Sequence, residues 1–99
     1  MINFYVNSIQ KVNDDLIDAA MKGDPKRLAE ALANEADLNA SRDMYGLTAL
    51  HYVVRKGNTQ MSQSLLDHSA NPVAQDNEGT MPIRRAILNG RNDLVEMIL

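Results

Sequence analysis

The chain has 99 residues, of which 44% are hydrophobic, and its formal net charge at pH 7 is −3. This length and composition fit one small globular domain. The negative balance argues against broad nucleic-acid binding, which depends on neutralising phosphates. Because the chain has no cysteine, neither disulfide bonds nor a cysteine-based zinc site is expected.

The N-terminal segment 1–12 carries no basic leader sequence. Its longest apolar run, residues 4–6, is too short for a signal peptide or a membrane span. We therefore expect a cytoplasmic or nuclear protein that is not secreted and has no membrane partner.

The same segment has helical spacing of its apolar residues. Tyr5, Ile9 and Val12 lead on to Leu16 at intervals of three or four residues. The segment is predicted to be a capping helix or an extension of the helix that follows it. A partly ordered tail is the alternative.

A pair of short helices is predicted next. Asp14 is a competent N-cap, because its side chain can accept from a helix-end N–H and its charge suits the positive end of the helix dipole. The first helix ends near Lys22, and residues 23–25 form a turn in which Pro25 suits the first position of the second helix. The second helix shows one apolar face, formed by Leu28, Ala31 and Leu32.

The clearest unit begins at Gly46, which suits a turn position with positive φ. Thr48 is a good N-cap. A short helix follows Thr48. Gly57 with Asn58 is expected to end it, because both residues tolerate the left-handed conformation. The apolar face of this helix consists of Leu50, Val53 and Val54, and that of the next helix of Met61, Leu65 and Leu66.

This order of roles recurs along the chain. Gly79 follows Gly46 at the same interval at which Gly90 follows Gly57. A third copy lies 34 residues upstream of the central helix, at Leu16, Ala19, Ala20 and Gly23. A period of about 33 residues with a core similar to T-P-L-H-x-A is typical of ankyrin repeats. The chain resembles that family from about Asp14 to Leu99.

The resemblance implies an all-α fold, an ankyrin-repeat solenoid of about three helix–turn–helix units joined by β-hairpin loops. Repeats are expected at about 13–40, 41–74 and 75–99, the last incomplete, after an N-terminal extension or capping helix at 1–12. In the family, the imidazole at the position of His51 hydrogen-bonds locally and ties the turn to the helix. Structural roles are assigned to turn, cap and helix-start residues, which are Asp14, Gly46, Thr48, His51, Gly57, Gly79, Pro82 and Gly90.

Three positions depart from the family pattern. Glu35 replaces a glycine, which makes a left-handed C-cap there disfavoured or strained. In the third repeat, Met81 replaces the threonine and cannot cap a helix, and Arg84 replaces the histidine and has no acceptor atom. We expect a looser junction between hairpin and helix in this repeat.

The last predicted helix carries Leu94, Val95, Ile98 and Leu99. A repeat array must cover its final apolar face, so Leu94, Ile98 and Leu99 are expected to be partly exposed. Three explanations stay open: the native chain continues, the face meets a partner or a second copy, or the end frays. Self-association through this uncapped helix is one form of the second explanation.

No catalytic constellation is predicted. His51 has a structural role by resemblance, and His68 suits the negative end of its helix. The pair Asp14 and Asp18 is explained more simply by a helix start and a surface pair with Lys22. The chain shows no phosphate-binding glycine loop and no cluster of metal ligands. We therefore expect neither enzyme activity nor a cofactor or metal.

A binding surface is the better-supported prediction, because stacked repeats leave a long concave face of hairpin tips and first helices. Met44, Tyr45 and Leu47 form an apolar patch on one loop that should face solvent. Arg55 and Lys56 could form a basic flank with Arg84 and Arg85, suited to an acidic partner. The resemblance places the contact residues at Arg42, Met44, Tyr45, Leu47, Arg55, Lys56, Asn77, Glu78, Leu88 and Asn89.

The sequence thus predicts a protein–protein interaction module that binds another protein and has no chemistry of its own. The alternative is an ankyrin appendage of a larger enzyme or receptor whose activity lies outside these residues. Repeat folds of this kind do not identify the partner.

Overall fold

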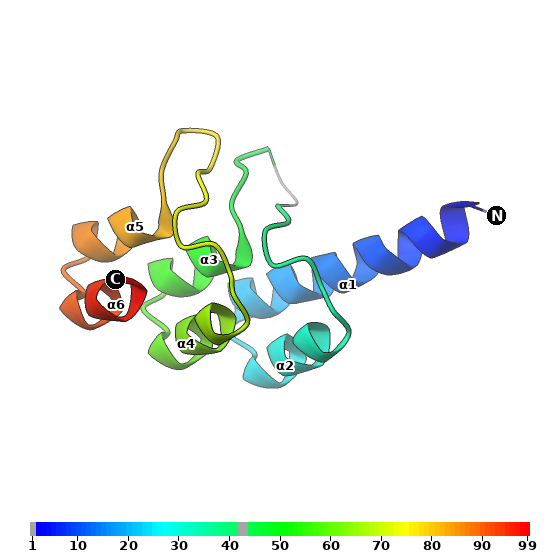
Figure 1. The fold of residues 1–99 in the computed structure, drawn as a ribbon, viewed down its shortest axis with the longest axis horizontal. Helices are drawn as coiled ribbons and strands as arrows, with labels where there is room; N and C mark the ends of the chain where they lie inside the picture. Colours follow the sequence, from blue (N-terminus) through cyan, green and yellow to red (C-terminus); the bar gives the residue numbers. More distant parts are fainter. Residues whose placement is uncertain (1, 42–43) are drawn as a thin grey trace.

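The computed structural model describes residues 2–41 and 44–99, and for residues 2–9 it gives the course of the backbone only. Two rows of helices are present, with α1, α3 and α5 in one row and α2, α4 and α6 in the other (Figure 1). The loops between successive helix pairs project to one side of the helices. The helix bounds are α1 Ile2–Lys22, α2 Pro25–Ala33, α3 Ala49–Arg55, α4 Thr59–Asp67, α5 Pro82–Leu88 and α6 Asn92–Ile98.

The helix pairs stack through the first row. Helix α3 packs against both α1 and α5, each helix of the second row packs on its own partner, and α6 also contacts α4. One cluster of buried side chains runs through all three pairs and includes Leu16, Leu50 and Leu94. Because no β-strand occurs in the described residues, the predicted all-α stack of helix pairs is confirmed.

Helix α1 continues without a break across residues 12 and 13. Asp14 therefore lies inside a helix and does not start one, contrary to the expectation from the sequence. The physical reason is that no glycine or proline interrupts residues 2–22, so the backbone N–H groups near Asp14 have partners one turn earlier. The N-terminal segment is an extension of the first helix.

Side chains cap the starts of α2, α3 and α4. The Asp24 carboxylate accepts from the backbone N–H of Arg27 (3.2 Å), and the Asn58 side chain accepts from that of Met61 (3.0 Å). Asn58 has a φ of −84°, so it does not take the left-handed conformation that was expected of it. It starts α4, and its backbone N–H donates to the Val53 carbonyl (2.9 Å) at the end of α3. Thr48 caps α3.

The two C-terminal helices lack such caps. Neither Met81 before α5 nor Arg91 before α6 makes a side-chain cap hydrogen bond. The sequence predicted this for Met81, because a thioether is only a weak acceptor. Part of the N-terminal turn of each helix is therefore left without the side-chain acceptor that Thr48 supplies to α3.

Helices α2 and α4 end in the left-handed conformation although neither has glycine there. Glu35 has a φ of +62° and Ser69 a φ of +71°. The backbone N–H of the next residue reaches back to a helix carbonyl in each case, from Ala36 to Ala31 (3.1 Å) and from Ala70 to Leu65 (2.9 Å). These bonds satisfy helix-end carbonyls. The left-handed conformation, which the sequence analysis expected to be disfavoured or strained at Glu35, is therefore present there.

In the last helix, the expectation of partial exposure is wrong for Leu94, whereas Ile98 is half-buried. Leu94 is fully buried, because it faces the common core, whereas Leu99 is 89% exposed. Ile83, which occupies in α5 the position of Leu50 in α3, is only half-buried. Among the described helices, α5 has a first-row neighbour on one side only. Ile87 and Leu88 are also exposed.

Candidate partner-binding surface

Two loops project from the helices: the second loop, which precedes α3, and the third loop, which precedes α5. They lie side by side and are joined by hydrogen bonds. The backbone N–H of Asn77 donates to the carbonyl of Tyr45 (2.9 Å). The Asn77 side-chain amide donates to the carbonyl of Met44. These bonds hold the two projecting loops side by side (Figure 1).

This close approach explains the glycine at position 46. Gly46 has a φ of +71°. A Cβ built there would lie 2.5 Å from Oδ1 and 3.1 Å from the backbone nitrogen of Asn77. Glycine is thus required both by the left-handed backbone and by the neighbouring loop.

Asp76 organises the tip of the third loop. Its carboxylate accepts from the backbone N–H groups of Glu78 and Thr80, both at 2.9 Å. The Asp76 N–H donates to the Thr80 carbonyl (2.9 Å) and closes the hairpin. Burial by itself raises the pKa of Asp76, but the two N–H donors, together with the electrostatic influence of His51 and Arg85, hold this pKa below its ordinary value.

His51 connects the start of α3 to the next repeat. Its Nδ1 accepts from the backbone N–H of Thr48 (3.2 Å), and its Nε2 lies 2.8 Å from the carbonyl oxygen of Thr80. A carbonyl can only accept, so Nε2 carries the hydrogen. In return, the backbone N–H of His51 donates to Thr48 Oγ1 (3.5 Å) and completes a capping box. The buried imidazole therefore fixes the loop of one repeat against the helix of another.

A cavity of about 250 Å³ opens between the two loops and the first-row helices. We call it the loop cavity. Tyr45 and Leu47 come from the second loop, and Arg55 and Arg85 from α3 and α5. Its lining is completed by Asp76, Asn77 and Glu78. The structure thus brings together five of the predicted contact residues, which are Tyr45, Leu47, Arg55, Asn77 and Glu78.

A second cavity, of about 350 Å³, lies beside the C-terminal ends of α1 and α3. We call it the helix-end cavity. It is lined by Met21, Tyr52, Arg55 and Lys56. Arg55 therefore borders both cavities, and we call the surface that contains these two hollows the concave surface.

The apolar patch predicted on the second loop is smaller than expected. Met44 is 77% exposed and Tyr45 is 61% exposed, but Leu47 is only 8% exposed. The expectation that Leu47 faces solvent is wrong, because it directly precedes the capped start of α3 and packs into the core cluster. Arg42, also a predicted contact residue, lies outside the described residues.

The remaining predicted contact residues lie at the C-terminal ends of α3 and α5. Lys56, Leu88 and Asn89 are all exposed. The Asn89 side-chain amide donates to the carbonyl of Arg55 at 3.5 Å. Asn89 therefore also links neighbouring repeats.

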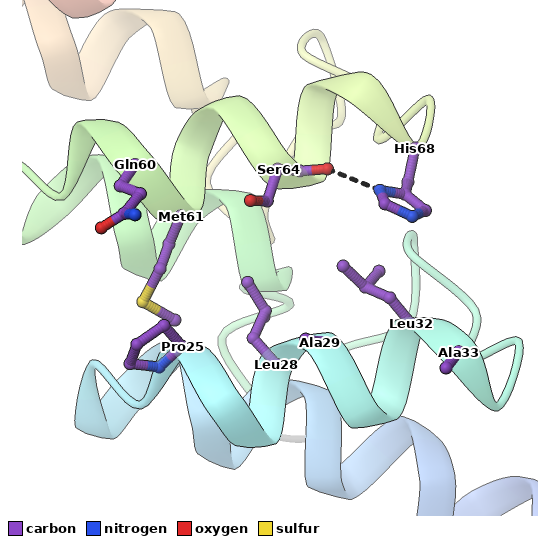
Figure 2. Close-up of a pocket in the computed structure, with 9 residues that line it drawn as sticks. All are labelled: Pro25, Leu28, Ala29, Leu32, Ala33, Gln60, Met61, Ser64 and His68. Carbon is purple, nitrogen blue, oxygen red and sulfur yellow. Dashed lines mark hydrogen bonds between the residues drawn. The ribbon is translucent and has the colours of Figure 1, made fainter.

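A groove on the opposite row of helices was missed by the sequence reasoning. Figure 2 shows it between α2 and α4, with a volume of about 280 Å³. His68 lies at one end, and its Nδ1–H donates to the carbonyl of Ser64 (2.8 Å). This bond fits the predicted structural role of His68 at a helix end. The lining residues are Pro25, Leu28, Ala29, Leu32, Ala33, Gln60, Met61, Ser64 and His68.

Metal and membrane features are absent from the part of the chain that the structure describes. No three histidine, aspartate or glutamate side chains gather there as a set of metal ligands. None of the described helices combines the length and the apolar character needed to cross a bilayer.

Comparison with known proteins identifies the family. The model of ankyrin repeats in three copies matches residues 16–99, a range that reaches into every helix pair described above. The chain belongs to the ankyrin-repeat family. Repeats of this family form a generic protein-interaction module. The stacked helix pairs described above are the fold of this class of protein.

The relatives it resembles are much longer proteins. The chain is 40% identical over 73 residues to the 2-5A-dependent ribonuclease of Mus musculus, covering 72% of this chain and 10% of the relative. It is 37% identical over 90 residues to the L-asparaginase of Dirofilaria immitis, covering 91% and 15%. Identity to the neurogenic locus Notch protein of Drosophila melanogaster is 32% over 72 residues, covering 73% and 3%. The chain thus spans only a small part of the length of each of these three relatives.

Proposed function

We propose that this chain binds a partner protein through its concave surface and carries out no chemistry of its own. The observation that supports this is the loop cavity, where side chains from two loops and two helices meet. The loops are held in register by the Asn77 bonds and the His51 bridge. A preorganised surface loses less conformational entropy when a partner binds.

The surface also has suitable chemistry for a protein partner. Tyr45 presents a large side chain that is 61% exposed, and tyrosine gives much contact area at a low entropic cost. Met44 beside it is flexible and adapts to irregular partners. The guanidinium groups of Arg55 and Arg85 supply planar sets of donors.

To test this function, Met44→Ser and Tyr45→Ala are combined and the purified variant is used to capture proteins from cell extract. We expect the specific partners captured by the wild type to be lost. Leu47 is left unchanged, because it belongs to the core and its substitution would destabilise the fold. The matched control is Val73→Ser, which removes another exposed apolar side chain. Val73 lines neither the loop cavity, nor the helix-end cavity, nor the groove between α2 and α4. Unchanged capture by a folded double variant would contradict the proposal.

A second candidate is an interaction segment within a larger enzyme or receptor. This candidate is supported by the relatives, because the chain covers only 10%, 15% and 3% of their lengths. Determining the native reading frame beyond Leu99 tests this candidate. A long continuation that encodes another domain is the expected result, and a stop codon directly after Leu99 would count against it.

Self-association is a third candidate, supported by the exposure of Ile87, Leu88 and Leu99. Sedimentation of the purified chain tests it. A dimer that Ile87→Ser and Leu99→Ser convert to a monomer is the expected result. A wild-type monomer at high concentration would remove the candidate.

A further inference from the structure

Cationic side chains that form no ion pair within the described residues border the two cavities. We define the basic strip as the cationic residues in or directly after the last turns of the first-row helices, which are Lys22, Arg55, Lys56 and Arg85. These helix ends lie next to one another because α3 packs against both α1 and α5. Four of the ten lysine and arginine residues of a chain with a net charge of −3 thus lie at neighbouring helix ends.

Three cations outside the basic strip have carboxylate partners. Asp15 pairs with Lys11 (3.3 Å) and with Arg27 (3.4 Å), and Asp93 pairs with Arg91 (2.9 Å). No such pair involves the basic strip among the residues that the structure describes. Asp76 lines the loop cavity with two of the strip's arginines and feels the charge of Arg85, but no ion pair joins it to either arginine; its carboxylate accepts two backbone N–H groups.

From this arrangement we infer the chemistry of the partner, an inference that rests on the proposed function. The concave surface binds an extended acidic polypeptide in which a carboxylate side chain neighbours an aromatic or apolar one. The carboxylate is received between Arg55 and Arg85, since guanidinium groups bind carboxylates through paired, charge-assisted hydrogen bonds. The apolar side chain packs against Tyr45 and the edge of Leu47, which line the same cavity.

The acids in the loop cavity favour a polypeptide over a nucleic acid. Asp76 and Glu78 line the cavity together with the two arginines. A nucleic acid carries a charge at every phosphate, so its backbone would be repelled by these carboxylates. A polypeptide can place single carboxylates at the arginines and turn backbone N–H donors toward Glu78.

A peptide selection tests the inference on the whole chain. A random peptide library displayed on phage is selected against the wild-type protein, and the enriched peptides are synthesised. We expect acidic residues beside aromatic or apolar ones. Replacing the glutamates of an enriched peptide by glutamines should weaken its binding about tenfold or more, because a charge-assisted bond is lost at each. Binding should also weaken as salt is raised, because salt screens the attraction.

Variants of the protein distinguish the effect of the charge at Arg55 from the effect of the net charge of the whole chain. Arg55→Glu is expected to weaken binding of the acidic peptide at least about tenfold. Lys26→Glu makes the same change in net charge on α2, at a residue that lines none of the three cavities, and is expected to leave binding within about twofold. Arg55→Gln, which removes the charge without reversing it, is expected to weaken binding less than Arg55→Glu does. Circular dichroism checks that each variant is folded.

The outcomes also separate this inference from the proposed function. Enriched peptides without acidic bias, whose binding is lost with Tyr45→Ala, would overturn the acidic chemistry and leave the function standing. Failure to enrich any peptide, or binding that depends on neither Tyr45 nor Arg55, would overturn both. A single-stranded oligonucleotide that binds through Arg55 while acidic peptides do not would overturn the choice of a polypeptide.

Discussion

At the scale of single residues, His51 is a buried polar side chain that joins two repeats. It is 1% exposed and joins Thr48 to Thr80, which lie in different repeats. We predict that His51→Ala destabilises the protein by about 2–4 kcal/mol, because the Thr48 N–H loses its imidazole acceptor, the Thr80 carbonyl keeps only the Asp76 N–H, and a buried space opens. Urea unfolding measures this. His68→Ala, at an exposed helix end, should cost less than about 0.5 kcal/mol, and equal losses would contradict the assigned role.

Glu35 and Ser69 carry a conformational cost that glycine would remove. Their positive φ values cost an L-residue about 1–2 kcal/mol, partly offset by the greater flexibility of glycine in the unfolded chain. Glu35→Gly and Ser69→Gly are each predicted to stabilise the protein by about 0.5–1 kcal/mol. Asn34→Gly is the control, because Asn34 has a φ of −90° and should gain nothing. Thermal unfolding decides between these outcomes.

Asp76 predicts a specific response to acid. Its pKa is held below the ordinary value in the fold, so the ionised carboxylate stabilises the native state above the unfolded pKa of about 4. That contribution is lost as pH falls through the lower, folded pKa. Asp76→Asn should therefore be less stable than the wild type at pH 7 and lose less stability on acidification. Melting temperatures across a pH series measure this difference. Glu30→Gln, an exposed change on α2, controls for net charge, and parallel curves for wild type and Asp76→Asn would contradict the prediction.

At the scale of elements, α3 and α5 are equivalent helices with different starts. Thr48 and His51 form a capping box for α3, whereas Met81 gives α5 no capping bond. Combining Met81→Thr with Arg84→His is predicted to stabilise α5 by about 1 kcal/mol. Hydrogen exchange of the α5 amides measures the effect locally. The reverse change, Thr48→Met, should speed exchange in α3, and unchanged α5 exchange in the double variant would contradict the prediction.

At the scale of the whole molecule, the core is one cluster shared by all three helix pairs. Leu50 is 1% exposed in the middle helix pair. We predict that Leu50→Ala costs about 2–5 kcal/mol and lowers the exchange protection of α1 and α5 together, because each packs on α3. Leu88→Ala, at an exposed position, is the control. Loss of protection confined to α3 and α4 would show that the repeats unfold separately.

Much of this fold is readable from local signals in the sequence. The repeat period places every helix pair, because each repeat must bury the same apolar face against its neighbours. The glycines at positions 46, 57, 79 and 90 all take positive φ. The start of the first helix was misjudged, since Asp14 is a good cap in isolation but no breaker precedes it.

The candidate site was predictable in outline and not in detail. Loop and helix-end positions followed from the repeat pattern, and five of them line one cavity. The burial of Leu47 could not be read from its place in a loop, because it depends on the core cluster that neighbouring helices form. The groove between α2 and α4 (Figure 2) was missed for a related reason. It depends on the spacing between two outer helices, which no local pattern encodes.

The sequence by itself determined the repeat unit, the helix faces and the turn glycines, because these depend on backbone preferences and on spacing within one repeat. Only the tertiary structure decided which loop residues are exposed, that Arg55 borders two cavities, and that His51 binds the next repeat. These features join residues of different repeats, and their geometry is set by how one repeat rests on another.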